Sequence, residues 1–197
     1  RYAIGGLRIE ALKNGQVDAT IEAPQSVLDE TARLASSDGP LTLKTTDGRL
    51  TLQGRGWKWF LEDNRLVISN NVQTTVRREF THEAPTTSTN RLIHITSQRL
   101  DYRPERAIFS GDVQARETEG SLDCDRLAIH FTSGERTRLD RLEAEGSVTL
   151  AQGAMRARAD RGTYRVRENE VVVDLQGNAS WSDGRRSGSA DHIQLDQ

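Results

Sequence analysis

The chain has 197 residues, a formal net charge of −2 and a hydrophobic fraction of 35%. A net charge near zero leaves no electrostatic footprint for nucleic acid. Together with frequent Val, Ile, Leu and Thr, it argues against an intrinsically disordered chain. The sequence contains no run of 18 or more apolar residues and therefore predicts no membrane-spanning helix. The single cysteine, Cys124, excludes an internal disulfide, and we expect it to be a small inward-facing core residue.

The first 40 residues predict a hairpin followed by an ambiguous segment. Residues 1–23 alternate between apolar and polar side chains around an Asn14-Gly15 pair, which is a strong hairpin signal. Residues 24–39 break this alternation, and Ser26 could cap one or two helical turns there or belong to a loop. Because the chain opens at Arg1 without a methionine, we also expect a signal peptide or anchor to have preceded it.

From Leu41 onward the sequence predicts short strands, the first two joined by a hairpin turn at 46–48. A Thr/Ser-rich stretch with Pro85 then predicts a linker or long loop at 81–91. We therefore divide the chain into regions 1–80 and 92–197, which could also form one continuous fold.

The second region alternates almost without interruption. In 155–159, period two places Met155, Ala157 and Ala159 on one face and two arginines on the other. Strands of about three to six residues with short connections require antiparallel neighbours. The sequence therefore predicts an all-β fold without βαβ units.

Two interleaved phrases repeat along the chain. The first, a Gly or Asn before a polar and then an apolar residue, occurs at 69–72, 110–113, 145–148 and 176–179, and we interpret it as the lead into a strand. The second, typified by Asp-Arg, occurs at 97–102, 124–129, 159–164 and 190–195. Successive copies of the first phrase are 41, 35 and 31 residues apart, a period typical of stacked architectures whose units bury their apolar faces against neighbours.

The sequence offers no constellation for catalysis. His82, His94, His130 and His192 lack the spacing of metal ligands, and no nucleophile or phosphate-binding motif occurs. We expect no catalytic residue, no metal and no cofactor. One hypothesis that stays open is an enzyme that acts on envelope glycans through two carboxylates.

The two phrases resemble those of the OstA-like family, which comprises the periplasmic lipopolysaccharide-transport proteins LptA and LptC and the matching N-terminal domain of LptD. The resemblance is clearest over residues 95–196, whereas residues 1–80 contain a more divergent LptC-like stretch at 41–76, and the first 40 match no family pattern. The resemblance implies an antiparallel, V-shaped two-sheet β-jelly roll whose apolar interior carries acyl chains.

The same resemblance implies a non-enzymatic periplasmic module that passes lipopolysaccharide along an apolar groove toward the outer membrane. It also implies an N-terminal anchor in the inner membrane. The partners would be lipopolysaccharide or a related glycolipid, other Lpt-type proteins that pair through edge strands, and head-to-tail copies of the chain, but no nucleic acid.

The expected groove-lining residues are apolar or aromatic and lie at inward positions of the second region. They are Leu100, Tyr102, Phe109, Val113, Leu127, Ile129, Val148, Leu150, Met155, Tyr164, Val173 and Trp181. The alternative is a structural or adhesive β-repeat domain with a filled core and no lipid. An open apolar groove between the two faces would distinguish the first hypothesis from the second.

Overall fold

The structure, a computed structural model, describes residues 2–13, 15–78, 91–132, 138–167 and 170–196, and its regular structure there is entirely β. The strands are β1 (Tyr2–Lys13), β2 (Gln16–Asp29), β3 (Leu34–Thr45), β4 (Leu50–Phe60), β5 (Arg65–Arg78), β6 (Arg91–Ser97), β7 (Arg99–Arg103), β8 (Arg106–Arg116), β9 (Gly120–Thr132), β10 (Arg138–Gln152), β11 (Met155–Arg167), β12 (Glu170–Ser182) and β13 (Ser187–Asp196). The loop predicted at 81–91 lies, except for Arg91, outside the described residues. Within the described part, no helix is long and apolar enough to cross a membrane.

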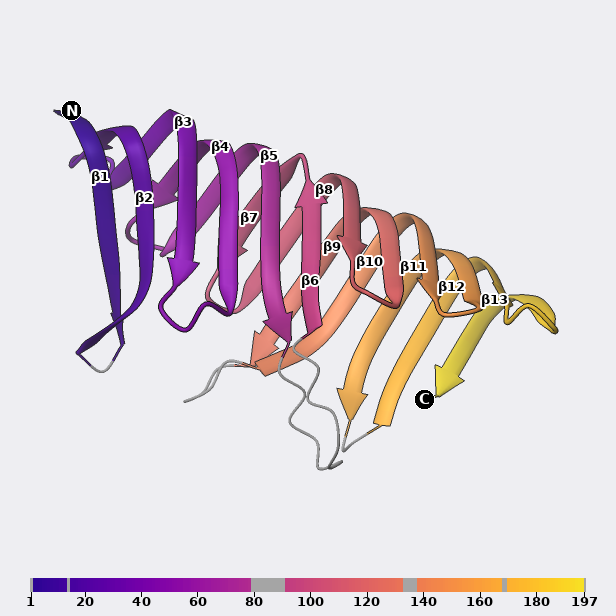
Figure 1. Ribbon diagram of the computed structural model, residues 1–197. Coiled ribbons are helices and arrows are strands. Elements are labelled where there is room, and N and C mark those ends of the chain that lie inside the picture. The colour runs from indigo at the N-terminus through magenta and orange to yellow at the C-terminus, as the bar shows by residue number, and fades with distance from the viewer. Residues whose placement is uncertain (1, 14, 79–90, 133–137, 168–169, 197) are drawn as a thin grey trace.

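All thirteen strands belong to one antiparallel sheet that follows the order of the chain (Figure 1). β6 and β7 together occupy one place, because both lie between β5 and β8. The all-β prediction is confirmed, as are the hairpins that join β1 to β2 and β3 to β4. The sheet runs on without interruption from β5 to β6 and β7.

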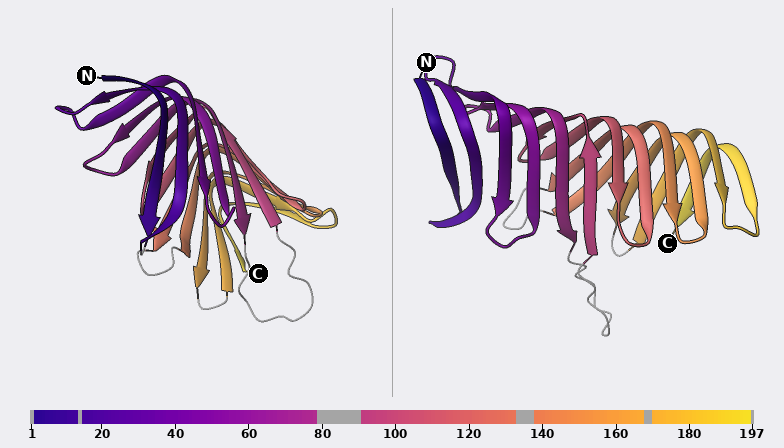
Figure 2. Two further views of the ribbon diagram at one scale, coloured as in Figure 1. Left: turned by 60° about the vertical axis from the view of Figure 1, so that its left-hand side comes forward. Right: turned by 45° about the horizontal axis from the view of Figure 1, so that its top comes forward.

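The sheet folds over along a line that crosses its strands, so that it forms a V with two limbs (Figure 2). On β8, β10 and β12 the fold line coincides with bulges where strand pairing shifts register. Each bulge holds two successive residues with positive φ, such as Gly146 at 77° and Ser147 at 48°. A bulge of this kind bends and twists a strand without ending it. We name this row of bends the fold line.

The fold line explains the first repeated phrase and corrects its interpretation. The phrase does not lead into strands but lies in the middle of β5, β8, β10 and β12. The strands are accordingly 5 to 15 residues long, rather than the three to six predicted. In the sequence, a glycine in a bulge cannot be distinguished from a glycine in a turn, because both require the same left-handed backbone.

In three of its four copies, the second phrase packs a side chain over the glycine of the first phrase on a neighbouring strand. A Cβ placed on Gly111 would lie 2.9 Å from Gln98 Cβ, one on Gly146 would lie 2.8 Å from Asp125 Cβ, and one on Gly177 would lie 2.9 Å from Asp160 Cβ. Gln98 Nε2 also donates to Asp112 Oδ2 at 2.6 Å, and Asn178 Nδ2 donates to Asp160 Oδ2 at 3.0 Å. We call each such packing of an Asp or Gln side chain over glycine a corner contact.

The helical turns considered for residues 24–39 are absent. This segment forms the end of β2, a turn, and the start of β3, with Val27 opposite Ser36 and Leu28 opposite Ala35. Ser26 is not an N-cap; it is buried within the strand. Pairing with β1 and β3 on both sides outweighs a weak local preference for helix.

The outer face of the sheet carries ion pairs and hydrogen bonds between side chains of neighbouring strands. Arg126 Nη1 lies 2.8 Å from Glu145 Oε2, and His130 Nε2 lies 3.1 Å from Glu143 Oε2. Arg65 grips Asp101 with two nitrogens, one of them at 2.9 Å, and this hydrogen-bonded guanidinium lowers the pKa of Asp101. Charged side chains are therefore held on the outside of the V.

The Asp101→Asn variant should be less stable at neutral pH by about 1 kcal/mol, because it loses a partly buried bidentate pair. The pKa of Asp101 is lowered in the folded protein, so the pair contributes stability above the ordinary carboxyl pKa of about 4. That contribution is lost as pH falls through the lowered pKa. Urea unfolding from pH 7 to pH 2 would measure it, and a difference from wild type that persists unchanged at pH 2 would contradict this assignment.

Candidate functional site: the inner face of the folded sheet

The inner face of the V is built from rows of side chains that run across the strands. The limb that contains Leu100 is here the first limb, and the limb that contains Leu150 is the second. In the first limb, the row next to the fold line is Trp57, Ile68, Leu100, Phe109, Leu127, Ala144, Gly162, Leu175 and Ile193. The row beyond it is Trp59, Leu66, Tyr102, Ala107, Ile129, Leu142, Tyr164 and Val173.

The second limb has a row that crosses the sheet from β1 to β13. It consists of Ile9, Ile21, Leu43, Leu52, Thr74, Ile95, Ala115, Leu122, Leu150, Ala157, Trp181 and Gly188. None of these residues, and none in the two rows of the first limb, is charged. Strand alternation alone produces this separation, because every second side chain points inward.

On β9 and β10, burial on the inner face decreases with distance from the fold line. In the row beside the line, Trp57 is 1% exposed, Ile68 is 0% and Leu127 is 2%. In the row beyond, Ile129 and Leu142 are only partly buried, and so is Leu150 in the second limb. The floor of the V is therefore packed. Farther out, some apolar side chains, such as Leu66 and Ile95, are also buried, whereas Ile129, Leu142 and Leu150 keep part of their surface in contact with solvent.

All twelve predicted residues lie at inward positions, but they divide into two groups by burial. Those that are buried are Leu100, Phe109, Val113, Leu127, Val148 and Val173. Those that are partly buried are Tyr102, Ile129, Leu150, Met155, Tyr164 and Trp181. Leu100, Phe109 and Leu127 are direct cross-strand neighbours in one row. Met155 stands apart, at the first position of β11 opposite Gln152.

The first region supplies part of every row of the inner face, and the predicted set omitted it. Trp57, Ile68 and Leu66 continue the rows of Leu100 and Tyr102 directly. Leu41 and Leu52 are 1% and 4% exposed and belong to the same core. The sequence signals for these residues were the alternation of Trp57-Lys58-Trp59 and the apolar run Leu66-Val67-Ile68.

Two titratable groups of the inner face, Tyr102 and Cys124, stay neutral at pH 7. Burial raises the pKa of Tyr102, with a smaller contribution from the charge of Asp18. Burial also raises the pKa of Cys124 to about 11, so its thiol is protonated at neutral pH and is a poor nucleophile. Cys124 is buried, as its expected core role requires. Across the described part of the chain, no three His, Cys, Asp or Glu residues gather as metal ligands.

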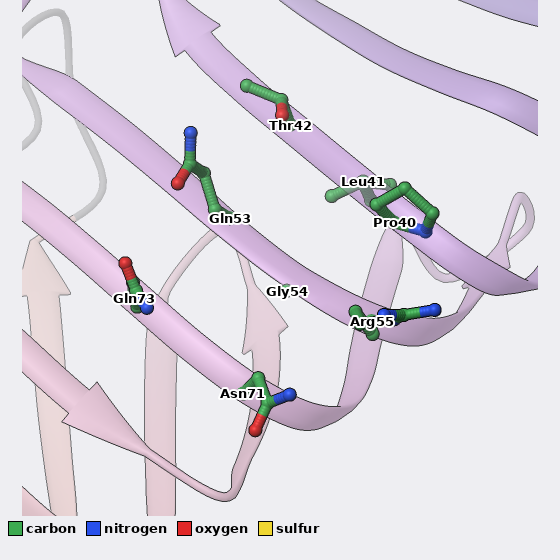
Figure 3. Close-up of a pocket in the computed structure, with 8 residues that line it drawn as sticks. All are labelled: Pro40, Leu41, Thr42, Gln53, Gly54, Arg55, Asn71 and Gln73. Atoms are coloured by element: carbon green, nitrogen blue, oxygen red, sulfur yellow. The ribbon is translucent and has the colours of Figure 1, made fainter.

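A hollow of about 340 Å³ lies on the outside of the fold line, over β3, β4 and β5 (Figure 3). Its lining includes Thr42, Gln53, Arg55, Asn71 and Gln73. The cross-strand pairs Thr42–Gln53 and Gln53–Gln73 place it on the face opposite the apolar rows. It therefore belongs to the solvated exterior and forms no part of the inner face.

Comparison with known proteins gives one match. Residues 93–197 match the family model described as LptA/(LptD N-terminal domain) LPS transport protein, which covers more than half of the chain. No curated protein and no solved structure matches the chain. The matched residues contain three of the four copies of the first phrase and all four of the second. The chain thus belongs to the LptA/LptD N-terminal domain family of lipopolysaccharide transport proteins.

Proposed function

We propose that the chain is a non-enzymatic module that binds lipopolysaccharide, or a related glycolipid, by its acyl chains on the inner face. The observation that carries this proposal is the uncharged row from Ile9 to Gly188. It crosses twelve strand places. Ile21, Leu52, Thr74, Ile95 and Ala157 in this row are buried, whereas other members, such as Leu122, Leu150 and Trp181, are partly exposed. At about 4.8 Å between strands, it offers an apolar track about 50 Å long.

The packed floor and the partly exposed limbs have different roles in this proposal. Side chains beside the fold line, such as Leu127, hold the two limbs together. Side chains farther out, such as Ile129 and Leu150, supply a surface on which acyl chains are removed from water. Burying such apolar area is favourable by about 25 cal/mol per Å². The hydrophobic effect alone would therefore drive binding, without a chemical reaction.

The proposed setting is the periplasm, with lipid passing toward the outer membrane and an anchor in the inner membrane. β1 and β13 are the two edge strands of the sheet, and each pairs with only one other strand within the described residues. Unpaired strand edges are templates for strand addition. We therefore propose that other Lpt-type proteins, and further copies of the chain, extend the sheet from these edges.

The proposal is tested by Leu150→Asp, with Ala151→Asp as its control. Leu150 points inward and the next residue, Ala151, points outward, opposite Arg156. The Asp at 150 should abolish binding of purified lipopolysaccharide, whereas the Asp at 151 should leave it within about two-fold, since only the first places a charge on the apolar track. Binding would be measured by fluorescence competition on protein whose fold is confirmed by circular dichroism.

Deacylated lipopolysaccharide should not compete for the site, because the proposal assigns affinity to the acyl chains. Equal binding by wild type and a folded Leu150→Asp variant would refute the proposal. A failure of wild type to bind any acylated glycolipid would instead favour a structural β-repeat with a filled core.

A further inference from the structure

A row of basic side chains lies on the outer face of the first limb, on the side of the sheet opposite the apolar rows. Each member directly precedes or follows a residue of the inner row that runs from Trp59 to Val173, so strand alternation points it outward. We name it the basic row. From β7 to β11 its members are Arg103, Arg106, His130, Arg141 and Arg165.

Five consecutive strands thus carry a basic residue at the same place. Arg103 pairs with Arg106, and Arg106 pairs with His130. His130 pairs in turn with Arg141, which pairs with Arg165. At about 4.8 Å between strands, the row is about 19 Å long. Like charges at directly opposite positions destabilise a sheet, so the row points to a negatively charged partner outside the chain.

Carboxylates of the chain neutralise only part of the basic row. Glu143 serves two of its members at once: His130 Nε2 lies 3.1 Å from Glu143 Oε2, and Arg141 Nε lies 3.0 Å from Glu143 Oε1. Asp101, two residues before Arg103, is already gripped by Arg65. The positive charge of the row therefore exceeds the negative charge that the chain sets against it.

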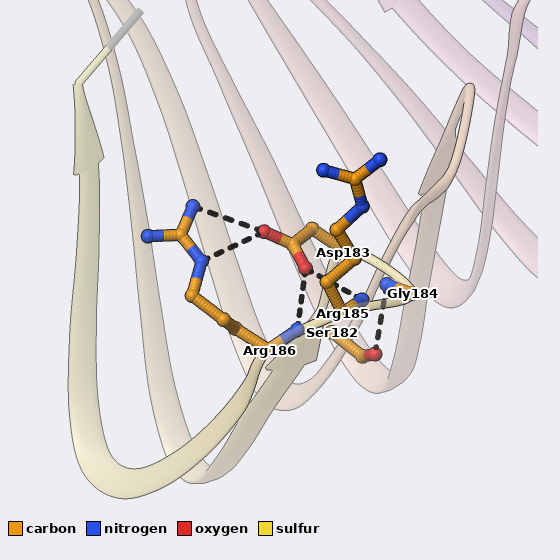
Figure 4. Close-up of polar contacts among 5 residues, drawn as sticks. All are labelled: Ser182, Asp183, Gly184, Arg185 and Arg186. Carbon is orange, nitrogen blue, oxygen red and sulfur yellow. Dashed lines mark hydrogen bonds and ion pairs between the residues drawn. The ribbon is translucent and has the colours of Figure 1, made fainter.

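A turn of the second limb shows how an arginine of this chain is satisfied by its own carboxylate (Figure 4). Arg186 donates through Nε and Nη2 to Asp183 Oδ2, at 3.2 and 3.1 Å. The backbone N–H groups of Arg185 and Arg186 donate to the other oxygen, Asp183 Oδ1, at 2.9 and 2.7 Å. Such a fork of two bonds is the arrangement that a guanidinium forms with a carboxylate or a phosphate.

Arg106 and Arg165 have no partner of this kind, since neither makes a hydrogen bond or an ion pair within the described residues. The Nε atoms of Arg106, Arg141 and Arg165 are buried and make no hydrogen bond. Ala128, an outward-facing neighbour of the row, is 0% exposed, so side chains of the outer face lie over the sheet. A buried N–H group without an acceptor is costly, and these guanidiniums gain when they turn outward to an oxyanion.

The form of the row favours an extended anionic surface over one small molecule. Neither the hollow over β3, β4 and β5 nor a second hollow beside His94 contains a residue of the row. The phosphate groups of a bilayer present negative charge along its whole length, and each arginine near such a surface is attracted to it. Because the net charge of the chain is −2, this attraction can only be local to the row.

We propose that the basic row docks the outer face of the first limb on the phosphate groups of an anionic phospholipid bilayer. Arg106, Arg141 and Arg165 donate to phosphate oxygens, for which the fork of a guanidinium is suited. The inference goes beyond the function proposed for the inner face. It concerns the opposite face of the sheet and lipid headgroups, so the row can be occupied while acyl chains lie on the apolar track.

The double variant Arg106→Gln, Arg165→Gln tests this inference, with Arg158→Gln, Arg185→Gln as its matched control. Both double variants remove two positive charges. Arg158 and Arg185 are exposed on the second limb, and neither guanidinium has a partner within the described residues. Since the change at 106 and 165 relieves like-charge pairs, this variant should fold with at least the stability of wild type. Circular dichroism and urea denaturation would check this.

Binding would be measured by co-sedimentation with vesicles at low salt. Wild type should bind vesicles that contain phosphatidylglycerol and should not bind vesicles of phosphatidylcholine alone. The variant at 106 and 165 should bind at least about ten-fold more weakly, while the control stays within about two-fold of wild type. About 0.5 M sodium chloride should abolish binding, because it screens the charges.

The inference is overturned if wild type does not bind phosphatidylglycerol vesicles, or if the two double variants weaken binding equally. Displacement of the vesicles by inorganic phosphate at the same phosphate concentration would show a site for small anions and would also overturn it. The inner face is tested separately. Leu150→Asp should bind vesicles as wild type does even where it no longer binds lipopolysaccharide, and loss of vesicle binding by this variant would place the contact on the inner face instead.

Discussion

Replacement of Gly146 by alanine should lower the free energy of unfolding by about 3 kcal/mol. Gly146 has a φ of 77°, where an L side chain costs about 1–2 kcal/mol. The added Cβ would also lie 2.7 Å from Asp125 Cγ and 2.8 Å from Asp125 Cβ. Overpacking of this kind adds about 1–3 kcal/mol. Urea denaturation followed by circular dichroism would measure the change.

Gly153→Ala is the matched control, because Gly153 also has a positive φ, 55°, but nothing lies within 4 Å of the added Cβ. It should lose only about 1 kcal/mol. Adding Asp125→Ala to Gly146→Ala should recover part of the loss, since it removes the carboxylate that the new methyl meets. If Gly146→Ala and Gly153→Ala are equally destabilised, the corner contact does not contribute to stability beyond its backbone conformation.

The fold class could be predicted from the sequence because alternation is a local signal. Met155, Ala157 and Ala159 are on one face as predicted, and Arg156 and Arg158 are exposed on the other. Strand length could not be predicted, because Gly146-Ser147 has the composition of a turn and only the pairing of β10 with both neighbours makes it a bulge. Pairing with neighbouring strands likewise explains why the segment around Ser26 is a strand, although its sequence contains helix-capping residues.

The alternation of apolar and polar residues also predicted which side chains face inward, but it could not predict how deeply each one is buried. Leu127 and Ile129 are two residues apart on the same face of β9, yet Leu127 is 2% exposed and Ile129 is only partly buried. That difference comes from distance to the fold line, which depends on register across the whole sheet. The contribution of Trp57 and Ile68 was missed because the candidate residues were all taken from 95–196, where the family resemblance is clearest.

This difference between Leu127 and Ile129 leads to an expected separation of stability from lipid binding. Leu127→Ala leaves a cavity beside the fold line and should lower the free energy of unfolding by about 3 kcal/mol. Ile129→Ala removes a partly exposed side chain and should lose only about 1 kcal/mol. For binding of purified lipopolysaccharide the order reverses: Ile129→Ala should weaken it several-fold, and folded Leu127→Ala should bind within about two-fold of wild type.

Both quantities can be measured on the same preparations, by urea denaturation and by fluorescence competition with acylated lipopolysaccharide. The two variants remove similar apolar volume from one strand, so a general loss of hydrophobicity cannot produce opposite orders. If Leu127→Ala weakens lipid binding as much as Ile129→Ala does, the acyl chains reach the floor of the V and the packed row opens when lipid binds. If neither variant changes lipid binding, the first limb does not contact the lipid, and the track is confined to the row of Leu150.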